Sequence, residues 1–78
     1  MIEIMVPNLG QSGMEVKIEA WFIKEGERIN KGETLYELSN EKLNQEIESP
    51  ITGVLKKIVK QAGELVEPGE IVAQMEEG

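Results

Sequence analysis

The side chains that most often do chemistry in proteins are missing from this chain. Its 78 residues include no cysteine and no histidine, and its fifteen acidic residues are all glutamates. A serine hydroxyl is a weak nucleophile without an imidazole beside it, and zinc and copper sites are usually built from the two missing residue types. The composition therefore predicts no catalytic residue and no metal site. The candidate that remains is a lysine amine used as a point of covalent attachment.

One lysine, Lys42, stands in the middle of a polar segment, residues 37–50 (ELSNEKLNQEIESP), which is flanked by short apolar runs. Asparagine is favoured at the first position of a β-turn, and Asn40 precedes Lys42 by two residues. Residues 40–43 then fit a four-residue turn with Glu41 and Lys42 as its central pair. After the turn, apolar and polar residues alternate as they do in a strand. The pattern predicts a β-hairpin with Lys42 at its tip.

Glycines and prolines cut the rest of the chain into short runs rich in isoleucine and valine, which favours strands over helices. Apolar pairs at helical spacing make residues 54–63 ambiguous. An internal repeat resolves this point, because a shift of 37 residues places segment 25–38 (EGERINKGETLYEL) on segment 62–75 (AGELVEPGEIVAQM). The repeat covers about 16–38 and 53–75. In the first copy of the repeat, the segment equivalent to the start of the ambiguous run contains tryptophan and β-branched residues. Both copies are therefore expected to be strands.

Two copies of one β-type half predict an all-β fold in a single domain, residues 1–78. We expect a flattened β-barrel or sandwich of two small antiparallel sheets with internal pseudo-twofold symmetry. Neither copy could bury much alone, so their apolar faces are expected to meet. The expected core contains Trp21 and four residues of each copy: Ile18, Phe22, Leu35 and Leu38, and Leu55, Val59, Val72 and Met75. The repeated glycines are expected to take positive φ in tight turns: Gly26, Gly32, Gly63 and Gly69.

The same symmetry places Lys42. Its equivalent in the second copy would be position 79, just past the last residue of the sequence. The hairpin tip and the chain termini are therefore symmetry counterparts, and they should lie at opposite ends of the domain. Lys42 would project into solvent on a rigid support, far from any tether at the termini. That geometry suits a carrier whose cargo must reach other proteins.

The charge of the chain restricts its partners. The formal net charge is −7, and an acidic surface is repelled by nucleic acids and by anionic membranes. No apolar run approaches the length of a membrane span, and the N-terminus lacks the basic, then apolar, pattern of a signal peptide. We expect neither nucleic acid nor membrane as a partner.

Several motifs together span nearly the whole chain: the start VPNLG (residues 6–10), the run EVKIEAW (15–21), and the spacing of residues 24–38 and 41–75. In these motifs the chain resembles the lipoyl domains of 2-oxoacid dehydrogenase complexes, which are close relatives of biotinyl carrier domains. The family's attachment lysine falls on Lys42. A family glycine eleven residues downstream falls on Gly53.

The chain departs from the family pattern at two places. Lipoyl domains commonly have Asp-Lys-Ala at the attachment site, whereas this chain has Glu41, Lys42 and Leu43, and a glycine common near the start is Val16 here. An acid, a lysine and a bulky aliphatic residue are similar to the lipoyl domains of acetoin-cleaving dehydrogenase complexes. The resemblance therefore leans towards that branch without identifying the substrate. Biotinyl domains typically place methionine on both sides of their lysine, which does not fit Glu41 and Leu43.

The resemblance implies a function. Lipoate would be amide-linked to Lys42 by a lipoate ligase or lipoyltransferase. The resulting swinging arm would accept an acyl group from a thiamine-dependent dehydrogenase, an acyltransferase core would pass the group to coenzyme A, and a flavoprotein, dihydrolipoamide dehydrogenase, would reoxidise the arm. The chain would be part of the acyltransferase component. Glu41, Leu43 and Gly53 would serve recognition, and the loop at residues 8–14 (NLGQSGM) is a candidate surface for partner choice.

Two alternatives remain open. One is a biotin carboxyl carrier domain, and the other is an unmodified module of the same fold that acts through protein–protein contact. The intact mass after expression with lipoate and biotin ligases would distinguish all three. The resemblance implies a cytoplasmic location in a bacterium, or the mitochondrial matrix in a eukaryote.

Overall fold

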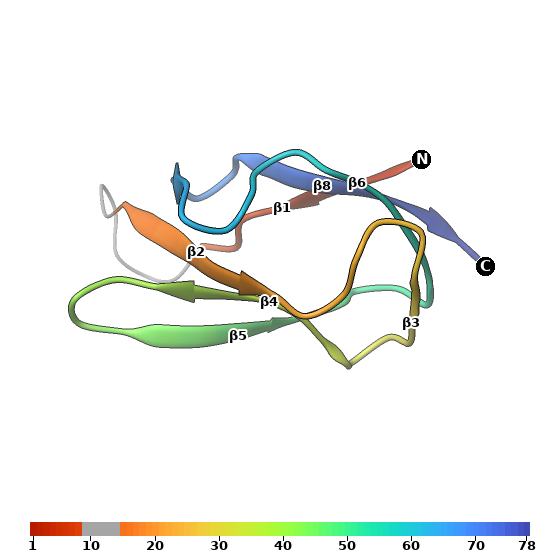
Figure 1. The fold of residues 1–78 in the computed structure, drawn as a ribbon, viewed down its shortest axis with the longest axis horizontal. Coiled ribbons are helices and arrows are strands. Elements are labelled where there is room, and N and C mark those ends of the chain that lie inside the picture. The colour runs from red at the N-terminus through yellow and green to blue at the C-terminus, as the bar shows by residue number, and fades with distance from the viewer. Residues whose placement is uncertain (9–14) are drawn as a thin grey trace.

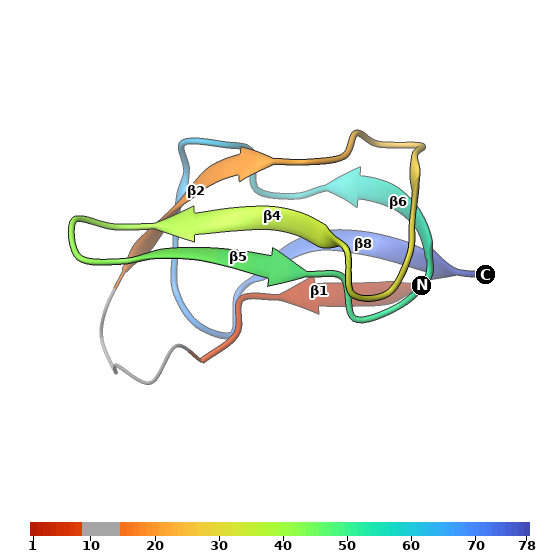
Figure 2. The same cartoon turned by 90° about the horizontal axis from the view of Figure 1, so that it is seen from below.

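The computed structural model describes residues 1–8 and 15–78, and all regular secondary structure in them is β-strand. The strands are β1 (Ile2–Met5), β2 (Val16–Trp21), β3 (Arg28–Ile29), β4 (Thr34–Ser39), β5 (Asn44–Glu48), β6 (Gly53–Ile58), β7 (Leu65–Val66) and β8 (Ile71–Glu77). They form two four-stranded antiparallel sheets, in the orders β1-β8-β6-β3 and β5-β4-β2-β7 (Figures 1 and 2). The expected all-β fold of two small sheets is confirmed. These described residues contain no helix long and apolar enough to cross a membrane.

The strands follow from alternation in the sequence. In β2, Val16 and Ile18 are buried while Lys17 and Glu19 are exposed, so one face packs on the core and the other meets solvent. In the run with the helical spacing, residues 54–58 belong to the strand β6, which pairs with β8, and residues 59–63 form the turn that follows. The repeat therefore predicted its conformation correctly, where apolar spacing alone left it ambiguous.

The pseudo-twofold symmetry is visible in the backbone hydrogen bonds. Exchanging β1 with β5, β2 with β6, β3 with β7 and β4 with β8 converts one sheet order into the other. The amide of Gly26 donates to the carbonyl of Leu55 over 2.7 Å, and the equivalent amide of Gly63 donates to the carbonyl of Ile18 over the same distance. Each half of the chain thus closes a turn on a strand of the other half.

The symmetry includes β1 and β5, which lie outside the repeat that the sequence predicted. The amide of Val6 donates to the carbonyl of Glu70 over 2.8 Å, and the amide of Ser49 donates to the carbonyl of Glu33 over 2.8 Å. Val6 and Ser49 are therefore equivalent, although their spacing differs from the offset of the repeat. The difference arises because the connection between β1 and β2 is longer than the connection between β5 and β6.

Four turns share one construction, a glycine followed by a glutamate. The expected positive φ angles are confirmed at Gly26, Gly32, Gly63 and Gly69, with values of 91°, 92°, 96° and 91°. In three turns the glutamate carboxylate accepts a hydrogen bond from the backbone amide three residues earlier: Lys24 to Glu27 at 2.7 Å, Asn30 to Glu33 at 2.8 Å, and Gln61 to Glu64 at 2.6 Å. The glutamate amide in turn donates to the carbonyl of that earlier residue. The sequence predicted the glycines but not this role of the glutamates.

The core lies between the two sheets, and six of the eight core positions predicted from the repeat are fully buried: Ile18, Leu35, Leu38, Leu55, Val72 and Met75. The prediction is wrong for Phe22 and Val59, whose exposed fractions are 50% and 40%. A β-bulge explains both. The register shifts after Ile18 in β2 and after Leu55 in β6, which adds one residue before the strand end and reverses the alternation there.

Because of the bulges, Trp21 and Ile58 pack against the core in place of their neighbours. The Trp21 indole donates to the carbonyl of Lys60 over 2.8 Å, and its ring lies 4.8 Å from the ring of Tyr36, centroid to centroid. Tyr36 is fully buried, and its hydroxyl has no hydrogen-bond partner among the described residues. Burial raises the pKa of Tyr36 to about 12, because a buried phenolate would lose its hydration.

The hairpin β4–β5 and the chain termini lie at opposite ends of the long axis, which measures 34 Å (Figures 1 and 2). This placement confirms the expectation drawn from the symmetry.

Gly53 is held by close packing. It begins β6 and pairs with Glu77 on one side and with Ile29 on the other. A Cβ atom at this position would lie 2.2 Å from the carbonyl oxygen of Glu76 and 3.1 Å from the Cα of Glu77. Both contacts are with backbone, so a side chain at residue 53 would force the β6–β8 pairing apart.

We predict that Tyr36→Phe leaves the free energy of unfolding unchanged or raises it by about 1 kcal/mol. The substitution removes a buried hydroxyl that bonds nothing and keeps the packing of the ring. Urea unfolding of both proteins measures the difference. A loss of about 1 kcal/mol or more would show that the hydroxyl has a hydrogen-bond partner in solution.

We also predict alkaline destabilisation that depends on this residue. The pKa of Tyr36 is raised from 10 to about 12 on folding, so its contribution to stability is complete below pH 10 and is lost as the pH rises towards 12. The chain has one tyrosine, so phenolate absorbance reports this group directly. Tyr36→Phe should lose less stability over this pH range. An unfolding free energy with the same pH dependence in both proteins would contradict the prediction.

A third prediction concerns Gly53→Ala, which should lower the free energy of unfolding by about 1–3 kcal/mol through the backbone clash. Gly26→Asn is the control, because nothing lies within 4 Å of a Cβ at that turn and asparagine tolerates positive φ. It should cost clearly less. Equal losses for the two variants would mean that close packing at Gly53 is not what excludes a side chain.

Candidate functional site

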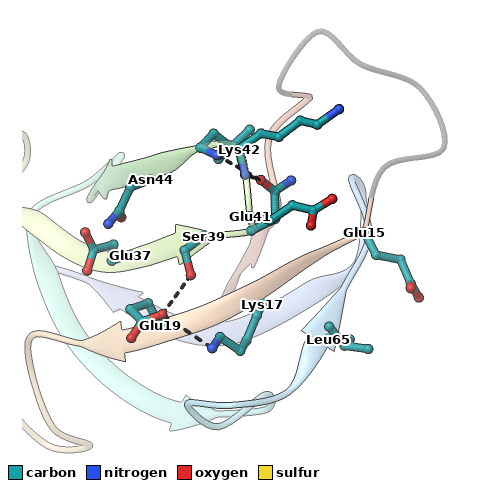
Figure 3. Close-up of a pocket in the computed structure, with 11 residues that line it drawn as sticks. Glu15, Lys17, Glu19, Glu37, Ser39, Glu41, Lys42, Asn44 and Leu65 are labelled. Carbon is teal, nitrogen blue, oxygen red and sulfur yellow. Dashed lines mark hydrogen bonds and ion pairs between the residues drawn. The ribbon is translucent and has the colours of Figure 1, made fainter.

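Residues 40–43 connect β4 to β5 as the predicted hairpin loop. The strand pairing ends at Ser39 and Asn44, and the amide of Asn40 donates to the carbonyl of Leu43 over 2.9 Å. Glu41 and Lys42 are exposed at the tip. The Lys42 side chain extends outward from the hairpin (Figure 3). The structure therefore presents a primary amine to solvent at the far end of the molecule from both termini.

The side chain of Asn40 organises this loop. Its Oδ1 atom accepts hydrogen bonds from the backbone amide of Lys42 over 2.7 Å and from that of Leu43 over 2.9 Å. An asparagine that bonds backbone amides two and three residues ahead stabilises a turn without help from the strand ladder. The residue that the sequence placed first in the turn thus fixes the backbone at the lysine.

A second set of contacts connects the base of the hairpin to β2. The hydroxyl of Ser39, which is buried, donates to Oε1 of Glu19 over 2.7 Å, and Nζ of Lys17 lies 3.6 Å from the same oxygen (Figure 3). The hydrogen bond from Ser39 lowers the pKa of Glu19, and the charge of Lys17 lowers the pKa further. The sequence did not indicate this link, because the cross-strand partner of Ser39 is Lys17, and Glu19 lies at the bulge two residues further along β2.

A groove of about 860 Å³ lies beside the tip. Lys17, Lys42 and the exposed Leu65 are among the residues that line it. Four other lining side chains are carboxylates, those of Glu15, Glu19, Glu37 and Glu41. We call this surface the acidic groove. Its charge would attract a basic surface of another protein more than an acidic one. No group of three or more potential metal ligands that could hold a metal ion occurs in residues 1–8 and 15–78.

The structure brings some of the predicted recognition residues together and separates others. Glu41 and Leu43 flank Lys42 and line the acidic groove. Gly53 lies elsewhere, in β6 beside Glu77, where it has the packing role described above. Of the loop at residues 8–14, positions 9–14 lie outside the described residues. Recognition by Glu41, Leu43 and Gly53 remains a prediction.

Comparison with known proteins identifies relatives over the whole chain. A family model for biotin and lipoyl attachment domains, described as "Biotin-requiring enzyme", matches residues 2–75. The chain is 39% identical over 77 residues, 99% of its length, to the dihydrolipoyllysine-residue succinyltransferase component of the 2-oxoglutarate dehydrogenase complex of Rickettsia bellii. It is 32% identical over 75 residues, 96% of its length, to the dihydrolipoyllysine-residue acetyltransferase component of the acetoin cleaving system of Pseudomonas putida.

These relatives are much longer proteins. The matched region is 19% of the Rickettsia protein and 20% of the Pseudomonas protein, so the chain spans about a fifth of each. Identity is higher to the succinyltransferase component than to the acetoin component.

A solved structure agrees with the sequence relatives. The solution structure of the lipoyl domain of the 2-oxoglutarate dehydrogenase complex from Azotobacter vinelandii superposes with a TM-score of 0.81. That domain is 28% identical in sequence, and the match covers 100% of this chain and 99% of the other. With a family model that matches nearly every residue, a lipoyl-domain fold and an exposed lysine at the hairpin tip, the chain belongs to the family of biotin and lipoyl attachment domains.

Proposed function

We propose that this chain is a lipoyl carrier domain in which lipoate is joined through an amide bond to Nζ of Lys42. The observation that carries the proposal is the position of Lys42, which is exposed in the loop between β4 and β5. That hairpin ends on the side of the molecule opposite the termini (Figure 1). The relatives support lipoate over biotin, because the Rickettsia and Pseudomonas proteins are both named as dihydrolipoyllysine-residue transferases. Glu41 and Leu43 also differ from the methionines typical beside a biotinyl lysine.

The residues at the tip fit this attachment. Amide formation needs an accessible amine on a backbone that stays in place, and Lys42 provides both because Asn40 bonds its amide and Ser39 connects the strand below to Glu19. The new bond joins Nζ to the carboxyl carbon of lipoate after a ligase has activated that carboxyl group. The activating group leaves with the electrons of the broken bond, and the lysine ammonium loses two protons. The domain thereby becomes one charge more negative than −7.

Lipoate, when bound, supplies the two sulfur atoms for acyl and electron transfer that a chain without cysteine lacks. The contribution of the chain is to present the group at the end of a long side chain and to offer the acidic groove to its partners. Tethering raises the local concentration of cargo at a partner's active site, to about the millimolar range for a short flexible linker.

The partners follow from the relatives by the same proposal. The chain would belong to a dihydrolipoamide acyltransferase, whose core transfers the acyl group to coenzyme A. A thiamine-dependent dehydrogenase would load the domain, dihydrolipoamide dehydrogenase would reoxidise it, and a lipoate ligase would modify it. The domain itself would carry the group without catalysing any of these steps. Which 2-oxoacid is used, or whether the substrate is acetoin, depends on those partners.

The first test is Lys42→Arg, which should abolish lipoylation and reductive acylation because a guanidinium does not form the amide. The free energy of unfolding should change by no more than about 0.5 kcal/mol, as expected for an exposed residue. Intact mass and peptide mapping after reaction with a lipoate ligase, and separately with a biotin ligase, measure the modification. Lys57→Arg, at an exposed position in β6, is the matched control and should be modified at the wild-type rate.

Three results would contradict the proposal. They are a lipoyl group found on Lys56 or Lys57, a domain that stays unmodified with a competent ligase, and a domain that accepts biotin in preference to lipoate. A large loss of stability in Lys42→Arg would show that the lysine is structural.

A second test moves the amine by one residue. In the double variant Glu41→Lys with Lys42→Glu, composition is unchanged, but the lysine occupies the other central position of the loop and leaves the backbone in another direction. Small misplacements at an enzyme active site can cost about a hundredfold in rate. We therefore expect lipoylation slower by about tenfold or more, measured by intact mass against time.

The fold of the double variant should be intact, which circular dichroism and the urea midpoint would check. If wild type and variant are modified at equal rates, the ligase reads neither the position of the lysine in the hairpin nor Glu41.

A further inference from the structure

The loop that carries Lys42 is built differently from the other tight turns of the described chain. Four turns use a glycine at positive φ followed by a glutamate. The loop at residues 40–43 has no glycine, and in the described residues no other residue type takes positive φ. The tip therefore keeps two residues with full side chains, Glu41 and Lys42, in ordinary backbone conformations.

We propose that Asn40 is the residue that positions Lys42 for modification, an inference that rests on the proposed lipoyl function. Its Oδ1 atom accepts from the amides of Lys42 and Leu43 at 2.7 and 2.9 Å, and its own amide donates to the carbonyl of Leu43 at 2.9 Å. One side chain and its own backbone thus make three hydrogen bonds across a loop of four residues.

These bonds determine where the amine can go. The Lys42 side chain is long and flexible, so its rotamers sweep a cone whose axis is the Cα–Cβ bond. The direction of that bond depends on φ and ψ of Lys42, and the bond from its amide to Asn40 restrains that backbone. A ligase that must bring Nζ onto an activated carboxyl carbon then meets the amine in a narrow range of directions.

The end of β4, which leads into the loop, is also held in place. Asn40 directly follows Ser39, whose hydroxyl is bonded to Glu19 on the neighbouring strand β2. The restraint therefore extends from the sheet through Ser39 and Asn40 to the backbone of Lys42 (Figure 3).

The carboxamide acts here through its oxygen. Its Nδ2 atom is buried and has no hydrogen-bond partner among the described residues. Replacing the NH₂ group by oxygen, as in Asn40→Asp, removes no bond that the structure shows. Asn40→Asp and Asn40→Ser both keep an acceptor, one with a new charge and one without, whereas Asn40→Ala has none.

The experiment measures the rate of lipoylation over a range of concentrations of the unmodified domain up to saturation, with a lipoate ligase, lipoate and ATP. Asn40→Ala should be modified about tenfold more slowly or worse, with the loss in kcat and a KM close to wild type, because the bound amine is misdirected. An acceptor should restore the rate, fully or in part, in Asn40→Asp or Asn40→Ser. Asn30→Ala is the matched control, since Asn30 also precedes a lysine in a turn, and it should react like wild type.

A second measurement needs no ligase. Amide hydrogen exchange of the unmodified domain should show protection at Lys42 and Leu43 in the wild type, loss of that protection in Asn40→Ala, and its retention in Asn40→Asp. The remaining amides of β4 and β5 should keep their protection in all three proteins. A loss of stability throughout the domain would instead raise exchange everywhere.

The inference is overturned if Asn40→Ala is lipoylated at the wild-type rate, if neither acceptor variant recovers any rate, or if exchange at Lys42 is the same with and without Asn40. A wild-type domain that is not modified at Lys42 overturns the proposed function and this inference with it. If the wild-type domain is modified at Lys42 and Asn40→Ala is modified at the same rate, the inference alone is overturned.

Discussion

The fold depends on hydrogen bonds that its two halves exchange. The amide of Gly26 reaches the carbonyl of Leu55, and the amide of Gly63 reaches the carbonyl of Ile18, so neither half completes its turns without a strand of the other. A chain of this size buries only a small core. Interlocking allows that core to be shared, since the apolar faces of both sheets contribute to one cluster of buried residues. Positive φ at the two glycines is what allows the backbone to return at these points.

That arrangement determines where a functional group can be placed. The symmetry makes the connection between β4 and β5 the counterpart of the pair of termini, and this connection lies at the end of the molecule opposite to them (Figure 2). The hairpin carries no core residue in its loop, so it can hold a polar tip without disturbing the packing. Its rigidity then comes from polar contacts, those of Asn40 within the loop and that of Ser39 with Glu19.

The fold and the attachment hairpin were predictable because both leave periodic signals in the sequence. The repeat placed the strands and the four glycines, and the turn preference of Asn40 placed Lys42 at a tip. The exposure of Phe22 and Val59 was not predictable from alternation, because a bulge inserts one residue into β2 and into β6 and reverses the faces beyond it. The link from Ser39 to Glu19 was also not predictable, because the strand partner of Ser39 is Lys17 and Glu19 lies at the bulge. The turn glutamates could have been found, since each of the four positive-φ turn glycines is followed by one.

The position of the two termini has a mechanical consequence. β1 and β8 are neighbours in one sheet and run antiparallel, with Ile2 opposite Met75, so both ends of the chain leave the molecule at the same side. Tension applied between the two ends would act on the β1–β8 pair from that side, and it would break the β1–β8 hydrogen bonds one after another. The hairpin at the opposite end lies outside that load path. A domain pulled by its flanking chain would therefore yield first at its tethered end, while the end that bears Lys42 kept its shape.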